Sequence, residues 1–367
     1  MSLPYHRLAR THRLGKYTPW HPFIELILLT AFSFALMLAF ILVVGFALVA
    51  VDYPLPLRGT FEELDESDPA MKFLLYGSLA AMIPAPFLAA RITGRRPRAL
   101  WSVDNRFRWG LFGRAALVVA TFHIVTSLLD AVFASTGTFL PDFDERSLII
   151  LLIVAAYTPL QCAAEEIIYR GALPQIVGAW IRKPWLAYLL PIPFFVLAHD
   201  YDPAGLFFVA IFAVFASILV HRTGGLEVAI AFHAGNNMSV EWYALMGIDA
   251  DITERPSLIF ISELSTWVLF AILLIVFWNF SPPAREPAPA RPQPGVHYPA
   301  VAPPPYPPHP ALQGHVPPHQ MPQPQHPQQP VPQPLQYPPS RNPLPVQYQQ
   351  PQYPPPAQYP PVPPYYR

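Results

Sequence analysis

The sequence predicts an all-α, polytopic membrane protein, with about eight transmembrane helices around an intramembrane cavity and a disordered C-terminal tail. Hydrophobic residues make up 53% of the 367 residues and charged residues only 13%, whereas charged residues form about a quarter of an average soluble domain. Long apolar runs recur between clusters of charge, and after Ser281 the composition changes to proline, glutamine and tyrosine. The net charge is zero and no basic segment is interleaved with aromatic residues, so we expect membrane lipid as a partner and no nucleic acid.

The apolar runs are long enough to cross a bilayer, because about 20 helical residues span its hydrocarbon core. The first run is too long for the apolar region of a signal peptide, so we expect it to remain as an anchor. The fifth run is short and contains Pro191 and Pro193, which a membrane helix tolerates when neighbouring helices satisfy the freed backbone groups. The eight predicted spans are 23–51, 71–90, 111–133, 148–173, 185–199, 204–220, 226–246 and 258–280.

The loops between these runs alternate in charge, which supports the count independently of hydropathy. Lys and Arg are retained on the cytoplasmic side of a membrane. We therefore expect a multi-pass protein of the plasma membrane with both termini in the cytoplasm, beginning with a cytoplasmic segment at 1–22. The basic loops are 7–16, 91–108, 182–183 and Arg222, and the acidic loops are 52–68, 142–145, 200–202 and 249–254.

Residues 281–367 form a Pro-, Gln- and Tyr-rich segment that holds most of the 50 prolines of the chain. So few aliphatic residues cannot bury enough apolar surface to offset the entropy of ordering, and repeated proline favours an extended polyproline II chain. We predict a disordered cytoplasmic tail. Its Pro-x-x-Pro spacings suit a polyproline-binding partner, although such spacings also arise by chance in so proline-rich a segment.

Two adjacent carboxylates, Glu165 and Glu166, lie inside the apolar run 148–173. An ionisable group at membrane depth is costly, so it indicates a functional site and requires a partner. Glu166 and Arg170 are one helical turn apart and are expected to pair on one face. Glu165 is rotated by about 100° from Glu166 and can face another group. We assign a structural role to Glu166 with Arg170 and a chemical role to Glu165.

Further polar candidates lie on two later spans. His199 ends the fifth span, and His233 and Asn237 lie one turn apart on the seventh. At 1.5 Å per residue from the cytoplasmic loops, Glu165, His199 and Asn237 reach depths of roughly 25, 24 and 20 Å, which predicts one shared cavity. Because His199 is close to Asp202 of an acidic loop, we expect the hairpin between the fifth and sixth spans to be sunk into the protein.

These residue types suit peptide hydrolysis. A carboxylate beside a neutral imidazole, in a site of low dielectric, can hold and deprotonate a water molecule. A second imidazole and a carboxamide, as in His233 and Asn237, can donate hydrogen bonds to the oxygen of a tetrahedral intermediate. The single cysteine, Cys162, allows no intramolecular disulfide and is interpreted as a small packing residue.

The sequence resembles the CAAX-prenyl-endopeptidase and bacteriocin-processing family (CPBP, or Abi), whose members are intramembrane proteases with about eight helices. That family carries the motifs Glu-Glu-x-x-x-Arg, Phe-x-x-x-His and His-x-x-x-Asn, in this order, on three membrane helices. The matching segments here are Glu165-Glu166-x-x-x-Arg170, Phe195-x-x-x-His199 and His233-x-x-x-Asn237.

The resemblance implies a transmembrane protease domain at 23–280 with its motif core at 148–246. Its substrates would be CAAX-like prenylated tails, as in eukaryotic members, or peptides and membrane-anchored proteins, as in bacterial ones. It further implies that Glu165 and His199 activate the attacking water while His233 and Asn237 line the oxyanion hole. The supporting motif residues are Glu166, Arg170 and Phe195.

The motifs leave two mechanisms open. Zinc held by Glu165, His199 and His233 would have the three protein ligands of a catalytic zinc site. The His-Glu-x-x-His helix typical of many zinc proteases is, however, absent from the sequence. We favour a glutamate-dependent mechanism without a cofactor and keep a zinc metalloprotease as the alternative.

Two other classes of function use the same features. A proton-relay transporter would use the buried Glu and His groups as its pathway, although the sequence shows no inverted repeat of discontinuous helices. A non-enzymatic scaffold or immunity-type protein would act through the proline-rich tail.

Overall fold

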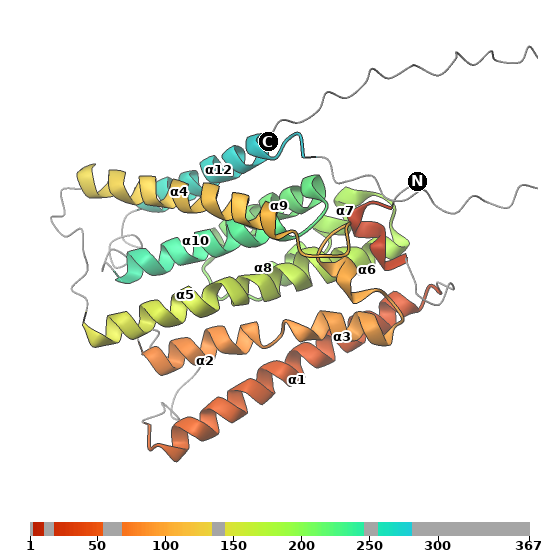
Figure 1. Ribbon diagram of the computed structural model, residues 1–367, viewed down its shortest axis with the longest axis horizontal. Helices are drawn as coiled ribbons and strands as arrows, with labels where there is room; N and C mark the ends of the chain where they lie inside the picture. Colours follow the sequence, from red (N-terminus) through yellow and green to blue (C-terminus); the bar gives the residue numbers. More distant parts are fainter. Residues whose placement is uncertain (1–2, 11–17, 54–67, 134–143, 246–255, 281–367) are drawn as a thin grey trace, which may run out of the picture. The chain divides into compact units, whose positions relative to one another are not determined.

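The computed structural model describes residues 3–10, 18–53, 68–133, 144–245 and 256–280. Within these ranges the chain is helical, with no strand besides an isolated bridge between Ser102 and Gly225, so the all-α prediction is confirmed. The predicted tail at 281–367 lies outside the described residues. In chain order (Figure 1) the helices are η1 (Tyr5–Arg10), α1 (His21–Ala50), α2 (Pro69–Ala80), α3 (Pro84–Ile92), η3 (Pro97–Leu100), α4 (Trp109–Phe133), α5 (Glu145–Glu165), η4 (Glu166–Ala172), α6 (Leu173–Trp180), α7 (Pro184–Leu189), α8 (Ile192–Val196), α9 (Pro203–Thr223), α10 (Glu227–Leu245) and α12 (Pro256–Val276).

Five helical segments of the described chain are long and apolar enough to cross a membrane, and the predicted eight are not confirmed. The fifth predicted span is broken into α7 and α8 at Pro191, a residue that has no backbone N–H to continue a helix. α10 carries polar residues along its length, and the part of α12 whose side chains are described, Leu264–Val276, is a short apolar helix. The five segments are His21–Ala50, Pro69–Ile92, Trp109–Leu129, Glu145–Trp180 and Pro203–Thr223.

Aspartates of the acidic loops begin three of the helices. The side chain of Asp68 accepts hydrogen bonds from the backbone of Ala70 and Met71, at 2.8 and 3.1 Å, and caps α2. Asp144 caps α5 and Asp202 caps α9 in the same way, each through one 2.7 Å bond. A capping carboxylate satisfies backbone N–H groups that the first helical turn leaves without partners.

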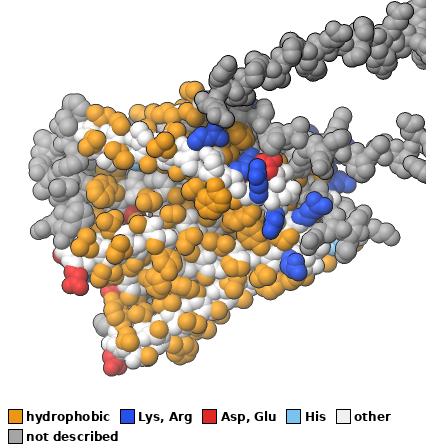
Figure 2. Space-filling view, in the orientation of Figure 1, with side chains coloured by type: hydrophobic (Ala, Val, Ile, Leu, Met, Phe, Trp, Pro, Cys, Tyr) orange, Lys and Arg blue, Asp and Glu red, His pale blue; other side chains and the backbone are white. Residues whose placement is uncertain are grey.

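The exterior is apolar over most of the face drawn in Figure 2. Large hydrophobic side chains such as Phe46 and Leu152 are each 70% exposed, which water would penalise and lipid would not. Lys and Arg side chains gather on this face toward the end where α3 lies, with an acidic side chain among them, and further Asp and Glu appear at the opposite end (Figure 2). An apolar wall with separated charge is typical of a membrane protein.

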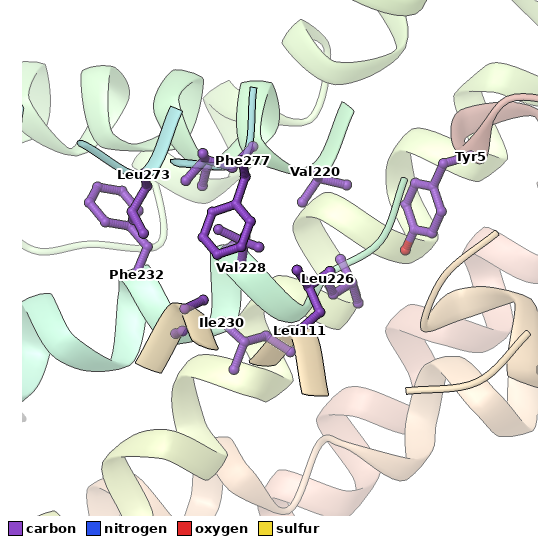
Figure 3. Close-up of a cluster of buried hydrophobic side chains, with 14 of the residues drawn as sticks. Tyr5, Leu111, Val220, Leu226, Val228, Ile230, Phe232, Leu273 and Phe277 are labelled. Atoms are coloured by element: carbon purple, nitrogen blue, oxygen red, sulfur yellow. The ribbon is translucent and has the colours of Figure 1, made fainter. Parts of the chain in front are cut away.

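Helix α10 occupies the centre of the fold, because it packs against α4, α5, α9 and α12. Its apolar side chains interlock with those of its neighbours in one buried cluster (Figure 3). α5 packs in turn against α2 and α10, so side chains on the facing sides of α5 and α10 meet inside the protein. The labelled members of the cluster are Tyr5, Leu111, Val220, Leu226, Val228, Ile230, Phe232, Leu273 and Phe277.

The N-terminal 3₁₀ helix η1 is docked against α6. Tyr5 and Leu8 are buried, and the Tyr5 hydroxyl donates a hydrogen bond to the carbonyl of Leu100. Gly178 of α6 makes the docking possible, since a Cβ at this position would overlap the backbone carbonyl of His6. Residues 3–10 of the predicted N-terminal segment are therefore an integral part of the fold.

Candidate active site

The two adjacent glutamates stand where the α-helical backbone changes. Glu165 is the last residue of α5, and Glu166 opens the π-helix η4, whereas the sequence predicts one continuous span at 148–173. The α-helical hydrogen bond to the carbonyl of Arg170 would need an N–H from Pro174, which has none. The wider π turn accommodates this missing hydrogen-bond donor. π turns inside α-helices frequently mark functional sites.

Glu166 is fully buried and has two partners. Its Oε1 lies 3.0 Å from Nη1 of Arg170, so the predicted ion pair within the helix is confirmed. The same oxygen accepts a 2.8 Å hydrogen bond from Nδ1 of His233 on α10. The Arg170 guanidinium also lies over the ring of Phe195, 3.9 Å from its centroid, and 5.8 Å from that of Phe212. Aromatic faces thus supply part of the environment that the buried cation needs.

Glu165 presents its two carboxylate oxygens to different partners. Oε1 accepts a 2.7 Å hydrogen bond from Nε2 of Gln161, one turn earlier on α5. Oε2 is buried and accepts no hydrogen bond within the described part of the chain, but it lies 3.6 Å from Nε2 of His233. One oxygen is therefore fixed, and the other is available to a reacting group.

The tautomer of His233 follows from its contact with Glu166. A carboxylate paired with Arg170 can only accept hydrogen bonds, so Nδ1 of His233 must carry a proton. The other ring nitrogen, Nε2, then points toward Glu165. The ring of Phe212, with its centroid 4.8 Å away, packs against the imidazole and fixes its plane.

Asn237 lies one turn beyond His233 and is half-buried. Its Nδ2 donates a long, 3.4 Å hydrogen bond to Oε1 of Gln161. The buried thiol of Cys162 donates to the same oxygen at 3.3 Å, in agreement with a packing role for that cysteine. Gln161 thereby contacts both Glu165 and Asn237, although the sequence interpretation did not select it.

His199 is held near the site by Phe195. Its Nδ1 donates a 2.8 Å hydrogen bond to the Phe195 carbonyl, and its ring lies 4.7 Å from the Phe195 ring. The Phe195 ring is itself 6.2 Å from that of His233. The described residues show no hydrogen bond or ion pair between His199 and Glu165, so the structure places His233, and not His199, beside the glutamate.

The hairpin around His199 is partly exposed. His199 is half-buried, and Leu197 beside it is 79% exposed. Pro191 separates α7 from α8 and leaves α8 only as long as Ile192–Val196, and the depth of this hairpin stays a prediction. The apolar character of Leu197 suits contact with lipid.

The described residues show no metal site at the predicted zinc donors. Among the residues that the structure describes, no three His, Cys, Asp or Glu side chains are grouped so as to hold an ion. The Nδ1 bonds of His233 to Glu166 and of His199 to a backbone carbonyl do not speak against a metal, because a histidine ligand commonly donates its other ring N–H in this way and coordinates through Nε2. Zinc at Glu165, His199 and His233 stays an untested alternative, and we route no chemical step through it.

Sequence reasoning missed two side chains that complete the site. Gln161 has a detectable signal, because it is a polar residue one turn before Glu165 in an apolar helix. Phe212 has none, since one phenylalanine among many in α9 becomes significant only when the packing of α9 against α10 is known.

Comparisons with known proteins agree with the motifs. Residues 146–239, which include all three motifs, match the family model described as type II CAAX prenyl endopeptidase Rce1-like. The chain is also similar to an uncharacterised protein of Bacillus subtilis (strain 168), YyaK, with 27% identity over 190 residues that cover 48% of this chain and 63% of the relative. The chain thus matches less than two thirds of that relative's length. No solved structure matches it.

Proposed function

Because the motif-bearing core at 146–239 belongs to the Rce1-like family of type II CAAX prenyl endopeptidases, we propose that the protein is an intramembrane endopeptidase in which Glu165 activates water. The observation that carries the proposal is Oε2 of Glu165, a buried oxygen without a hydrogen bond from any described residue, 3.6 Å from Nε2 of His233. Leaving a buried acceptor without a donor is costly. Such a cost is expected where the group must act on substrate water.

In the proposed reaction, Glu165 removes a proton from water and the water oxygen forms a bond to the carbonyl carbon of the scissile peptide. The carbonyl oxygen becomes an oxyanion. When the carbon–nitrogen bond breaks, Glu165 returns the proton to the leaving nitrogen, which restores the carboxylate. His199 assists as a hydrogen-bond acceptor, since its Nδ1 is bound to a carbonyl and the neutral ring leaves Nε2 free to accept from water.

His233 and Asn237 are the proposed oxyanion donors. Asn237 Nδ2 keeps one N–H beyond the bond that it makes to Gln161. His233 already uses its Nδ1 proton toward Glu166, so it donates from Nε2 only as the imidazolium.

The proposed substrate is a prenylated C-terminal peptide or a membrane-anchored protein. The test uses purified full-length protein in liposomes with farnesylated peptides that end in CAAX-like sequences, and mass spectrometry to detect the released C-terminal fragment. Glu165→Gln should lower the cleavage rate by at least 10²-fold, because it removes the base. A parallel comparison of membrane proteomes from cells carrying either form should reveal uncleaved precursors with Glu165→Gln.

The control is Glu145→Gln, which removes an exposed carboxylate at the start of α5 and should leave cleavage unchanged. Equal cleavage by wild type and Glu165→Gln would reject the proposed mechanism. Chelator treatment separates the two mechanisms in the same assay, because activity should persist with a glutamate base and fall with a required zinc ion.

A further inference from the structure

We propose that Gln161 is a positioning residue that orients the base and one oxyanion donor of the reaction at the same time. This inference rests on the proposed endopeptidase function. Gln161 is buried in α5, one turn before Glu165, and lies outside the three motifs. No other described side chain donates a hydrogen bond to Glu165.

The two ends of the carboxamide have different partners. Nε2 donates to Oε1 of Glu165 at 2.7 Å, and Oε1 accepts from Nδ2 of Asn237 at 3.4 Å. Glu165 belongs to α5 and Asn237 to α10, so Gln161 connects the two helices that carry the proposed base and donor. The amide orientation follows from this network, since a carboxylate needs a donor opposite it.

The hydrogen bond to Oε1 determines which oxygen reacts. With Oε1 held by Gln161, rotation of the Glu165 carboxylate would break a bond to a charged acceptor. Oε2 therefore stays directed toward Nε2 of His233, 3.6 Å away. At the other end of the carboxamide, Oε1 of Gln161 accepts a hydrogen bond from one N–H of Asn237 and so orients that side chain. The second N–H of Asn237 is left to donate to the oxyanion. Pre-orientation of this kind lowers the reorganisation needed at the transition state.

A purely structural role predicts a different outcome, and Gln175 provides the matched comparison. Gln175 is also a buried glutamine with both carboxamide ends bonded, since its Oε1 accepts from Arg95 and its Nε2 donates to the carbonyl of Ala99 at 2.9 Å. Neither Arg95 nor Ala99 belongs to the proposed site. Loss of Gln175 should thus reduce stability without altering the chemical step.

The experiment compares Gln161→Met with Gln175→Met in the liposome assay on a farnesylated peptide. Methionine keeps the side-chain length and removes every hydrogen bond of the carboxamide. For Gln161→Met we expect kcat to fall by roughly tenfold to hundredfold, the usual effect of one bond to a charged group, with KM unchanged. For Gln175→Met we expect a lower melting temperature and an unchanged kcat per folded molecule. Gln161→Asn, which keeps a neutral carboxamide on a side chain one methylene too short for the same partners, should also lower kcat and replaces Gln161→Met if that variant does not fold.

A wild-type kcat in folded Gln161→Met would overturn the inference while the loss of activity in Glu165→Gln still supported the endopeptidase. If the wild type cleaved no peptide, both would fall. A measurement without substrate tests the geometry itself. Solid-state NMR of protein labelled at the Gln side-chain nitrogen and the Glu carboxyl carbon should show a through-space cross-peak that disappears in Gln161→Met, and its absence from wild type would contradict the proposal.

Discussion

Glu166 shows how one residue can serve both the stability and the chemistry of the site. The sequence interpretation gave it a structural role with Arg170, and the structure shows that pair at 3.0 Å. The same oxygen also accepts from His233 at 2.8 Å. The carboxylate therefore compensates a buried cation and also contacts a proposed oxyanion donor, while the division between a structural Glu166 and a chemical Glu165 stays a prediction.

Glu166→Gln should damage stability and activity together. It leaves the Arg170 guanidinium buried without its counter-charge, which costs about 3–5 kcal/mol when a buried pair is broken. The double variant Glu166→Leu/Arg170→Met removes both charges and should recover most of that stability, while His233 still lacks its Nδ1 acceptor. Thermal unfolding in detergent measures the stability of each variant, and peptide cleavage measures its activity. A stable double variant with wild-type cleavage would show that Glu166 does not orient His233.

At the scale of elements, the irregular segments carry the site. Glu166 and Arg170 lie in the π-helix η4, and Phe195 lies in the short helix α8, which holds His199 in the turn that follows. Regular apolar helices such as α1 and α9 form the wall around them. The N-terminal helix η1 is a further irregular element, docked beside η4 through its contacts with α6.

The docking of η1 should weaken in acid. Nε2 of His6 donates to the carbonyl of Arg182 at 3.2 Å, but burial, followed by the charges of His221 and Arg7, lowers the pKa of His6 from its ordinary 6.5. The undocked segment therefore takes up a proton more readily than the docked one. The stabilisation is complete above pH 6.5 and is lost as the pH falls from there through the lower pKa of the docked state.

Hydrogen exchange measures this prediction directly. Amides of residues 3–10 should exchange faster, relative to the intrinsic rate, at pH 5 than at pH 7.5. His6→Gln keeps a donor for the Arg182 carbonyl and cannot titrate, so its protection should not depend on pH. Equal protection of the wild type at both pH values would contradict the expectation.

At the scale of the whole molecule, contacts within one helix could be predicted from residue spacing, whereas contacts between helices could not. The Glu166–Arg170 pair is readable from the sequence because residues four apart share a helix face. The bonds from Glu166 to His233 and from Gln161 to Asn237 join α5 or η4 to α10, and their existence depends on how those helices pack. The eight spans expected from hydropathy are not confirmed, since five helical segments of the described chain are long and apolar enough to cross a membrane and 185–199 is divided into two short helices at Pro191. The orientation of the termini stays a prediction from the charge of the loops.

The tail gives the last prediction, because it separates an enzyme from a scaffold. Every contact of the proposed site lies between Gln161 and Asn237, so a chain truncated after Phe280 should cleave the farnesylated peptide with the kcat and KM of the full-length protein. In cells, full-length Glu165→Gln should not process the membrane precursors that the wild type cleaves, whereas the truncated chain should process them. Both proteins must accumulate in the membrane to the wild-type level. The reverse result, with function lost on truncation and kept in Glu165→Gln, would assign the biological role to a polyproline-binding partner of residues 281–367. Loss in both would indicate that the tail brings substrate to a working protease, which a normal rate on the free peptide would then confirm.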